Sequence, residues 1–194
     1  MGILQRQNYL SHWNYFLALE RDVEHLSRYI EFSTHNWEAY SLEMARILLA
    51  ASSETDVLLK ALCEKLAPEK GADSINKYKD VIKHHFPAIP QFEALLPRWG
   101  LNLTPWSNWD NDDVPIWWTA NNKVKHHRDG EFHRANLHNT LNSVAALYVI
   151  NLYFYRNQAL SGELIPMQTL FRPSNEHFGG TTFNDVEFGI NYNL

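Results

Sequence analysis

The 194-residue sequence contains one cysteine, no long apolar run and no excess of positive charge. Because a disulfide needs two cysteines, Cys63 alone excludes an intramolecular bridge and suits a reducing compartment. A membrane-spanning helix needs roughly 20 consecutive apolar residues, and no stretch approaches that length. The first ten residues lack the apolar stretch of a secretory signal. We therefore expect a cytoplasmic protein with no membrane partner.

Charge and motifs exclude several functional classes. With 17 basic and 22 acidic residues, the net charge is −5. Because proteins that coat nucleic acid by bulk charge are basic, any nucleic-acid contact must be local. The sequence has no phosphate-binding glycine loop, no dinucleotide fingerprint, no G-x-S-x-G and no HEXXH or cysteine pair. His133 and His138 are five residues apart, which does not suit one helix face. We expect no cofactor and no metal site.

Apolar residues recur at helical spacing through most of the chain. In the first segment Trp13, Phe16 and Val23 follow one face, and Glu20 is expected on another. This pattern predicts an all-α fold, a bundle of four to five main helices occupying residues 1–160. The predicted helices span residues 12–33, 37–66, 74–85, 115–126 and 131–157.

Two segments lack that periodicity. Residues 91–114 are expected to be irregular, with one helical turn at 91–96 and a high density of tryptophan. Tryptophans in such a loop either pack it down or form an exposed platform for nucleic-acid bases. Residues 161–194 are rich in glycine and proline. They are expected to form an arm with short strands, such as Leu164–Phe171 and Thr181–Phe188, packed on the bundle or on a dimer partner.

A polar segment, residues 121–138, holds four of the ten histidines together with two lysines and two arginines. On a helix, Asn122 and His126 share a face, Lys125 lies beside them, and Arg128 follows at the helix end. Lysine and arginine can hold a phosphate while a histidine moves a proton, as metal-free RNA cleavage requires. Alternatively, the cations complement the carbonyl end of the helix dipole.

Further residues are assigned to the same hypothesis. Phosphate contacts are expected from Lys123, His127, His133 and Arg134. Glu54 interrupts the apolar stripe of the second helix, and Glu43 lies three turns before it on the same side. Glu54 either pairs with a cation of a neighbouring helix or, with Glu43, orients the polar segment across the bundle. An i,i+4 pair of Asp56 and Lys60 is expected on another face.

The polar segment and the helix after it, NNKVKHHRDGEFHRANLHNTLNSVAALYVINLYFY, resemble the HEPN superfamily of helical bundles. The likeness is to a branch that reads Asn-x-x-Lys-His-x-Arg between its last two helices. Here Asn122, Lys125, His126 and Arg128 occupy those positions. The segment 43–60 is similar to the second helix of that branch, and the match covers residues 12–157.

This resemblance implies a bundle that is often dimeric, with the polar motif near the dimer cleft. Many members are metal-independent endoribonucleases of toxin–antitoxin or phage-defence systems, and others bind RNA, nucleotides or proteins without catalysis. The usual motif is an arginine four to six residues before the histidine, and Asn121-Asn122 stands where Arg-Asn is expected. Lys125 or Arg128 would have to supply that charge. The expected partners are RNA, a second copy and an antitoxin or other protein. The alternative is a non-catalytic helical dimer that binds proteins or nucleotides.

Overall fold

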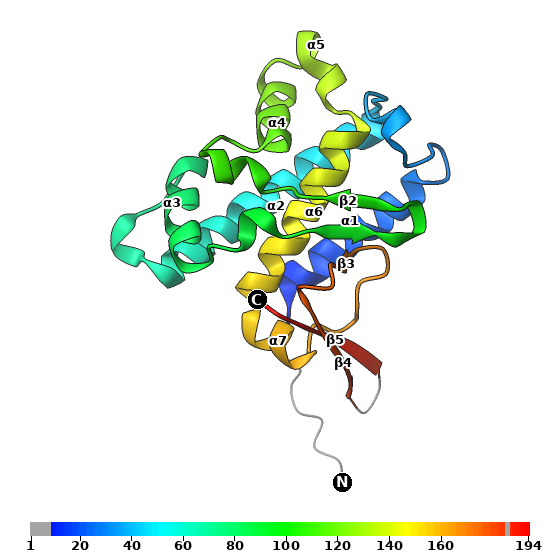
Figure 1. Cartoon of the computed structure of the whole chain (residues 1–194). Helices are drawn as coiled ribbons and strands as arrows, with labels where there is room; N and C mark the ends of the chain where they lie inside the picture. The colour runs from blue at the N-terminus through cyan, green and yellow to red at the C-terminus, as the bar shows by residue number, and fades with distance from the viewer. Residues whose placement is uncertain (1–8, 185–186) are drawn as a thin grey trace.

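The computed structural model describes residues 9–184 and 187–194, and these residues are mostly helical (Figure 1). The helical class predicted from the sequence is confirmed at this level. The described residues form five helices of 11 residues or more, together with the short helices α5 (Arg128–Glu131) and α7 (Arg156–Ser161). The long helices are α1 (Ser11–Leu26), α2 (Leu42–Leu66), α3 (Ile75–His85), α4 (Ile116–His126) and α6 (Leu137–Phe154).

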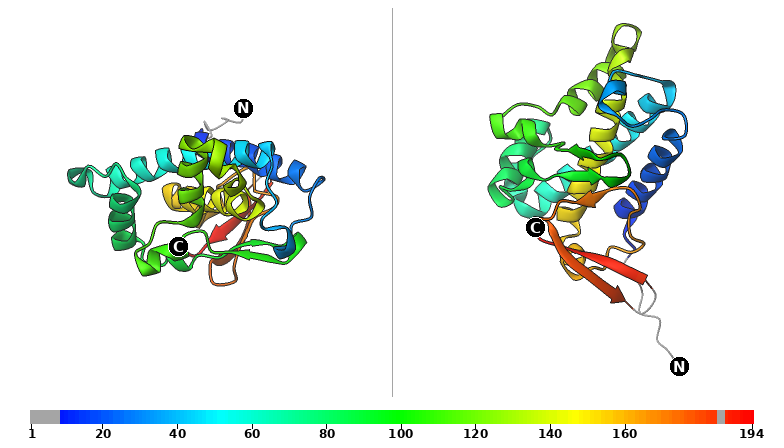
Figure 2. Two further views of the ribbon diagram at one scale, coloured as in Figure 1. Left: turned by 90° about the horizontal axis from the view of Figure 1, so that it is seen from above. Right: turned by 45° about the vertical axis from the view of Figure 1, so that its right-hand side comes forward.

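Helix α6 runs through the middle of the helical body and packs against α1, α2 and α4 (Figure 2). Nearly all of its side chains from Leu137 to Tyr153 are buried, as expected for a helix that is apolar on almost every side. The prediction that this helix begins at residue 131 was wrong. Residues 132–134 form a 3₁₀ turn instead, and Asn136 caps α6 by accepting a hydrogen bond from the Asn139 backbone N–H at 3.0 Å.

The connection between α1 and α2 is longer than predicted. Helix α1 ends at Leu26 instead of residue 33, and the chain then carries Phe32 into the core, 4.6 Å from the Trp99 ring. Helix α2 starts at Leu42 instead of residue 37. Its N-cap is Ser41, whose hydroxyl accepts a hydrogen bond from the Met44 backbone N–H at 3.1 Å. Tertiary burial and a local cap therefore override the helical periodicity here.

Residues 91–114 contain two strands that the sequence did not predict. Strand β1 (Ala94–Leu96) pairs antiparallel with β2 (Leu101–Leu103) and with β3 (Arg172–Pro173), in the order β2-β1-β3. Of the tryptophans in this segment, Trp106 and Trp109 are fully buried and Trp99 is half-buried. The expectation of a packed loop is confirmed for Trp106 and Trp109, and a base platform on these two rings was wrong.

The C-terminal arm contacts the helical body through buried polar groups. Glu20 is 1% exposed, which corrects the prediction that it faces away from the core. Its carboxylate accepts hydrogen bonds from backbone N–H groups of the arm. The Tyr192 hydroxyl lies 3.1 Å from the Tyr148 hydroxyl of α6 and accepts a hydrogen bond from Gln168 at 2.8 Å. These contacts bury the start and the end of the arm against α1 and α6.

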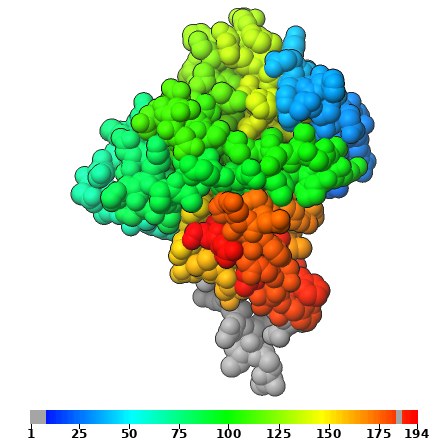
Figure 3. All heavy atoms as spheres, in the orientation of Figure 1, coloured from blue at the N-terminus to red at the C-terminus, as the bar shows by residue number. Residues whose placement is uncertain are grey.

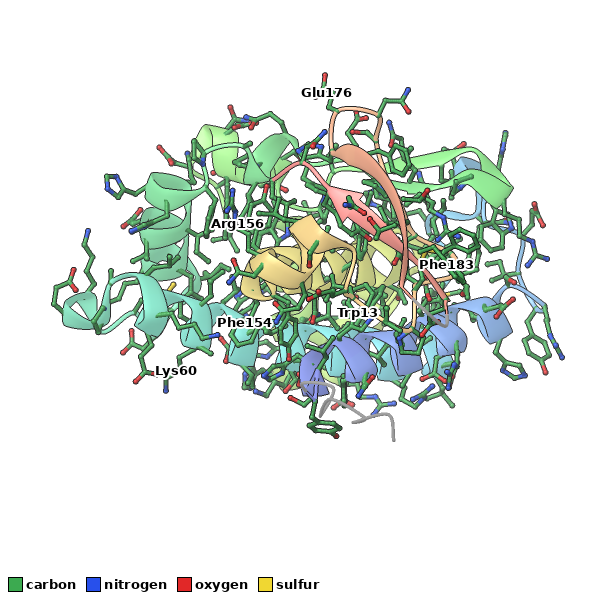
Figure 4. The ribbon with its side chains drawn as sticks, turned by 90° about the horizontal axis from the view of Figure 1, so that it is seen from below. Trp13, Lys60, Phe154, Arg156, Glu176 and Phe183 are labelled. Carbon is green, nitrogen blue, oxygen red and sulfur yellow. The ribbon has the colours of Figure 1, made fainter. Side chains whose placement is uncertain are left out.

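The arm ends in an antiparallel hairpin of β4 (Phe178–Asn184) and β5 (Glu187–Tyr192), which extends away from the helices (Figure 1). Phe183, labelled in Figure 4, is 60% exposed near its far end, as is Phe188 of β5. Residues 185–186 of the predicted strand Thr181–Phe188 lie outside the described residues, as do residues 1–8, on which the expectation of no signal sequence largely rests. Among the described residues, no helix has the length and apolar character to cross a membrane.

Candidate functional site

The polar segment runs from the second half of α4 through α5 to the start of α6, and the turn between α4 and α5 lies at one end of the molecule, away from the C-terminal arm (Figure 3). Helix α4 stops at His126, and the His127 backbone N–H donates to the Lys123 carbonyl at 2.8 Å. An open depression of about 690 Å³ lies over this turn. We call it the tip depression, and its lining residues are Lys123, Lys125, His126, His127, Arg128, Asp129, Gly130 and Glu131.

Three of the four expected catalytic residues line the tip depression: Lys125, His126 and Arg128. All three are exposed. Asn122, the fourth, is exposed on α4 outside the lining, and its side-chain oxygen accepts a 3.4 Å hydrogen bond from Asn121. The site is therefore a solvent-facing group of cations and imidazoles, and the two helices do not enclose it.

The four expected phosphate-binding residues divide into two pairs. Lys123 and His127 line the tip depression, whereas His133 and Arg134 lie on the following 3₁₀ turn. Arg134 forms an ion pair with Glu131 and thereby lowers the pKa of that carboxyl. Because Glu131 is already paired with Arg134, its negative charge neutralises less of the positive charge of Lys123 and Lys125 than an unpaired carboxylate would.

The expected supporting carboxylates lie elsewhere. Glu43 binds Arg46 at 2.6 Å, which lowers the pKa of Glu43, and Arg46 also reaches Asp22 of α1 at 2.7 Å. Glu54 accepts a hydrogen bond from His12 Nδ1 of α1 at 2.5 Å. Of the two roles expected for Glu54, pairing with a neighbouring helix is the one that the structure shows. Glu54 joins α2 to α1 directly, Glu43 holds Arg46 within α2, and neither carboxylate orients the tip depression.

The remaining expected pair, Asp56 and Lys60, lies on the exposed side of α2. The described part of the chain shows no ion pair between these two residues. Asp56 instead faces Tyr78 of α3, whose pKa is raised by burial and then by this carboxylate. Lys60 points away from the body of the protein (Figure 4). Neither residue contributes to the tip depression.

A neighbouring aromatic surface was not predicted from the sequence. Tyr40 forms a β-bridge with Asn136, which places it beside the tip. Its ring lies 5.9 Å from the Phe132 ring in an edge-to-face arrangement, and the Arg128 guanidinium lies 5.0 Å from the centre of the same Phe132 ring. No periodicity or motif links Tyr40 to Phe132, because their contact depends on how the α1–α2 connection folds.

His138, the last residue of the polar segment, is drawn inward. Its ring lies 4.9 Å from that of Trp37, and its backbone N–H donates to the Trp37 carbonyl at 3.2 Å. Burial lowers the pKa of His138, partly opposed by the nearby Glu38 carboxylate. This histidine therefore serves the packing of α6 and does not extend the tip depression.

A scan against protein-family models and searches of curated proteins and of solved structures found no match to this chain. Residues 9–184 and 187–194 contain no group of three or more His, Cys, Asp or Glu side chains placed to hold a metal ion.

Proposed function

We propose that the protein binds RNA at the tip depression and that its cations hold the phosphates. The observation that carries this proposal is the convergence of Lys123, Lys125 and Arg128 on one open surface of an otherwise acidic protein. Arginine offers a phosphate two parallel N–H donors, and lysine offers a mobile point charge. The resemblance to HEPN bundles favours RNA as the polyanion and supports a HEPN-type fold for residues 12–157.

The narrower hypothesis is metal-independent RNA cleavage by a toxin- or defence-type protein, with His126 as the proton carrier. A histidine beside Lys125 and Arg128 could take the 2′-hydroxyl proton while the cations stabilise the crowded phosphate. A catalytic histidine is commonly oriented by a hydrogen bond to a carboxylate. Among the described residues, no carboxylate forms such a bond with His126, which lines the tip depression. The geometry therefore supports binding more strongly than cleavage.

Binding is tested by fluorescence anisotropy with a labelled single-stranded RNA over a series of salt concentrations. The Lys125→Ala/Arg128→Ala double variant should lose about tenfold or more in affinity and show a shallower salt dependence, since two phosphate contacts are removed. Lys70→Ala, which removes an exposed lysine of the 3₁₀ turn that follows α2, is the matched control. If the cations serve only the dipole of α4, wild-type protein will not bind RNA and the proposal fails.

Cleavage is tested separately, by incubating RNA with the protein in the presence of a chelator. His126→Ala should abolish cleavage, whereas His84→Ala, an exposed histidine of α3, should leave it unchanged. RNA that stays intact with wild-type protein at every pH tried would reject the ribonuclease hypothesis. It would leave the binding proposal standing.

A second candidate function is a non-catalytic homodimer formed through the β4–β5 hairpin. In the described part of the chain β4 pairs with β5 along one edge, and no strand pairs with its other edge. That edge is available to a further strand. Phe178 and Phe183 are exposed on β4, and no residue of that strand is charged. Because identical uncharged strands do not repel each other, a second copy of this chain is the favoured occupant.

The dimer is tested by light scattering after size-exclusion chromatography. A Phe183→Lys variant should shift a dimer to monomer, because it places like charges along the paired edges. Tyr15→Lys, an exposed aromatic of α1, is the control and should not change the mass. A monomeric wild-type protein, or a dimer unaffected by Phe183→Lys, would reject this interface.

A further inference from the structure

We infer that Tyr40 is a stacking surface for an unpaired base, so that the ligand of the tip depression is single-stranded RNA. This inference rests on the proposed function, to which it adds the class of RNA. Tyr40 is 54% exposed, and its β-bridge to Asn136 and ring contact with Phe132 place it next to the tip. An exposed aromatic ring beside a group of cations is the usual arrangement for binding a single strand, because bases stack while phosphates contact the cations.

The rings and the charge form a continuous surface. The Arg128 guanidinium lies over Phe132, and the Phe132 ring meets the Tyr40 ring at an interplanar angle of 88°. Tyr40 is thus separated from a cation of the tip depression by one ring. A strand whose phosphate contacts Arg128 would therefore have a neighbouring base within reach of Tyr40.

The backbone around Tyr40 is held in place from both sides. The Leu137 N–H donates to the Ala39 carbonyl at 2.8 Å, and the Asn136 side chain donates to the Glu38 carboxylate at 3.1 Å. Immediately after Tyr40, Ser41 caps α2. The tyrosine is therefore fixed on rigid elements while its ring stays exposed, and binding would order little that is not ordered already.

The same geometry disfavours a duplex. In a double helix the faces of the bases are covered by their neighbours, so an aromatic ring has no base to stack on without unpairing. Exposed Leu42 lies two residues after Tyr40, and together they could also serve a protein contact. Comparison of ligands with and without bases separates these two uses.

The experiment measures affinity for a labelled 12-nucleotide oligouridine and for an abasic ribose-phosphate chain of equal length. Wild-type protein should bind oligouridine more tightly, and Tyr40→Ala should reduce its affinity for oligouridine by about tenfold. Tyr40→Ala should leave affinity for the abasic chain unchanged. Tyr40→Phe, which keeps the ring, should retain binding, and Tyr15→Ala is the control for loss of an exposed tyrosine.

The outcomes separate this inference from the function on which it rests. Equal affinity of wild-type protein for the two chains would overturn base stacking without any variant, even if Tyr40→Ala failed to fold. Binding that depends on Lys125 and Arg128 but not on Tyr40 would likewise overturn it while leaving RNA binding intact. Absence of binding to either chain would reject the proposed function itself. Preferred binding of a matched RNA duplex would also contradict the inference.

Discussion

Glu20 of α1 and Leu170 of the C-terminal arm are joined by a 2.8 Å hydrogen bond, from the Leu170 backbone N–H to the Glu20 Oε1. The same carboxylate accepts from the backbone N–H groups of Phe171 at 3.1 Å and Thr169 at 2.8 Å. Since the side chain is 1% exposed, these donors replace the water that a carboxylate would otherwise need. Glu20 is thus the point at which the first helix holds the arm.

Replacing Glu20 should therefore destabilise the whole protein. We expect Glu20→Ala to lower the free energy of unfolding by roughly 3 kcal/mol or more, because several buried backbone N–H groups lose their acceptor. Glu24→Ala removes an exposed carboxylate of the same helix and should change stability by less than about 0.5 kcal/mol. Urea denaturation measures both values. Equal stability of the two variants would show that the arm is not held in this way.

The contact between His12 and Glu54 provides a second prediction. Glu54→Ala should lower the melting temperature, because it leaves the partly buried His12 ring without its acceptor. RNA binding at the tip depression should not change, since Glu54 contacts α1 instead. Glu64→Ala, which removes an exposed carboxylate of the same helix, is the matched control. Loss of RNA binding by a folded Glu54→Ala protein would restore the sequence-based idea that Glu54 supports the polar segment.

Stability should fall in mild acid because burial lowers the pKa of two histidines, the buried His177 and the half-buried His138. Burial lowers the pKa of His177, opposed by Glu176 and Glu93, and the His177 ring packs 4.1 Å from that of Phe92. The ordinary pKa of a histidine is 6.5, and the pKa of His177 in the folded protein is lower. At pH values between these two, the unfolded chain binds more protons than the folded protein. The contribution of His177 is therefore present above pH 6.5 and lost as the pH falls through the folded pKa. His138 acts in the same direction.

This dependence is measured as the free energy of unfolding between pH 7.5 and pH 5. We expect a shallower decrease for His177→Gln than for the wild-type protein, since one of the titrating groups is absent. His84→Gln removes an exposed histidine and should keep the wild-type slope. An unchanged slope in His177→Gln would contradict the assignment of acid sensitivity to this residue.

The single thiol should be unreactive in the folded protein. Cys63 is buried on α2, and burial raises its pKa to about 11. Because the thiolate is the reactive form, a thiol reagent at pH 8 should label Cys63 only after unfolding. The rate of modification should therefore follow denaturant concentration. Rapid labelling of native protein would show that α2 opens locally.

The sequence predicted helices best where local signals and tertiary packing agree. Helix α3 was expected at residues 74–85 and occupies Ile75–His85, bounded by Pro87 and Gly71. Glu20 shows a signal that was missed, since it lies four residues after Phe16 and three before Val23. That spacing puts a carboxylate on the apolar face of α1, where it required a partner.

Other features depend on contacts that no local pattern encodes. Strand β1 pairs with β3, which is far along the chain. The sequence of either segment, read by itself, therefore does not show that the two will pair as strands. The grouping of Lys125, His126 and Arg128 was predictable because they are close in sequence. The approach of Tyr40 to Phe132 was not, because it depends on the path of residues 27–41 over the start of α6.

The hydrogen bonds of Glu20 also constrain the order in which the chain can fold during synthesis. The donors for this carboxylate come from residues 169–171, so they leave the ribosome long after α1. Until then Glu20 lacks these donors, so its carboxylate must stay in contact with water. The packing of α1 is therefore completed only after residues 169–171 have been synthesised, and chains truncated before them should be recognised by cellular quality control as unfinished.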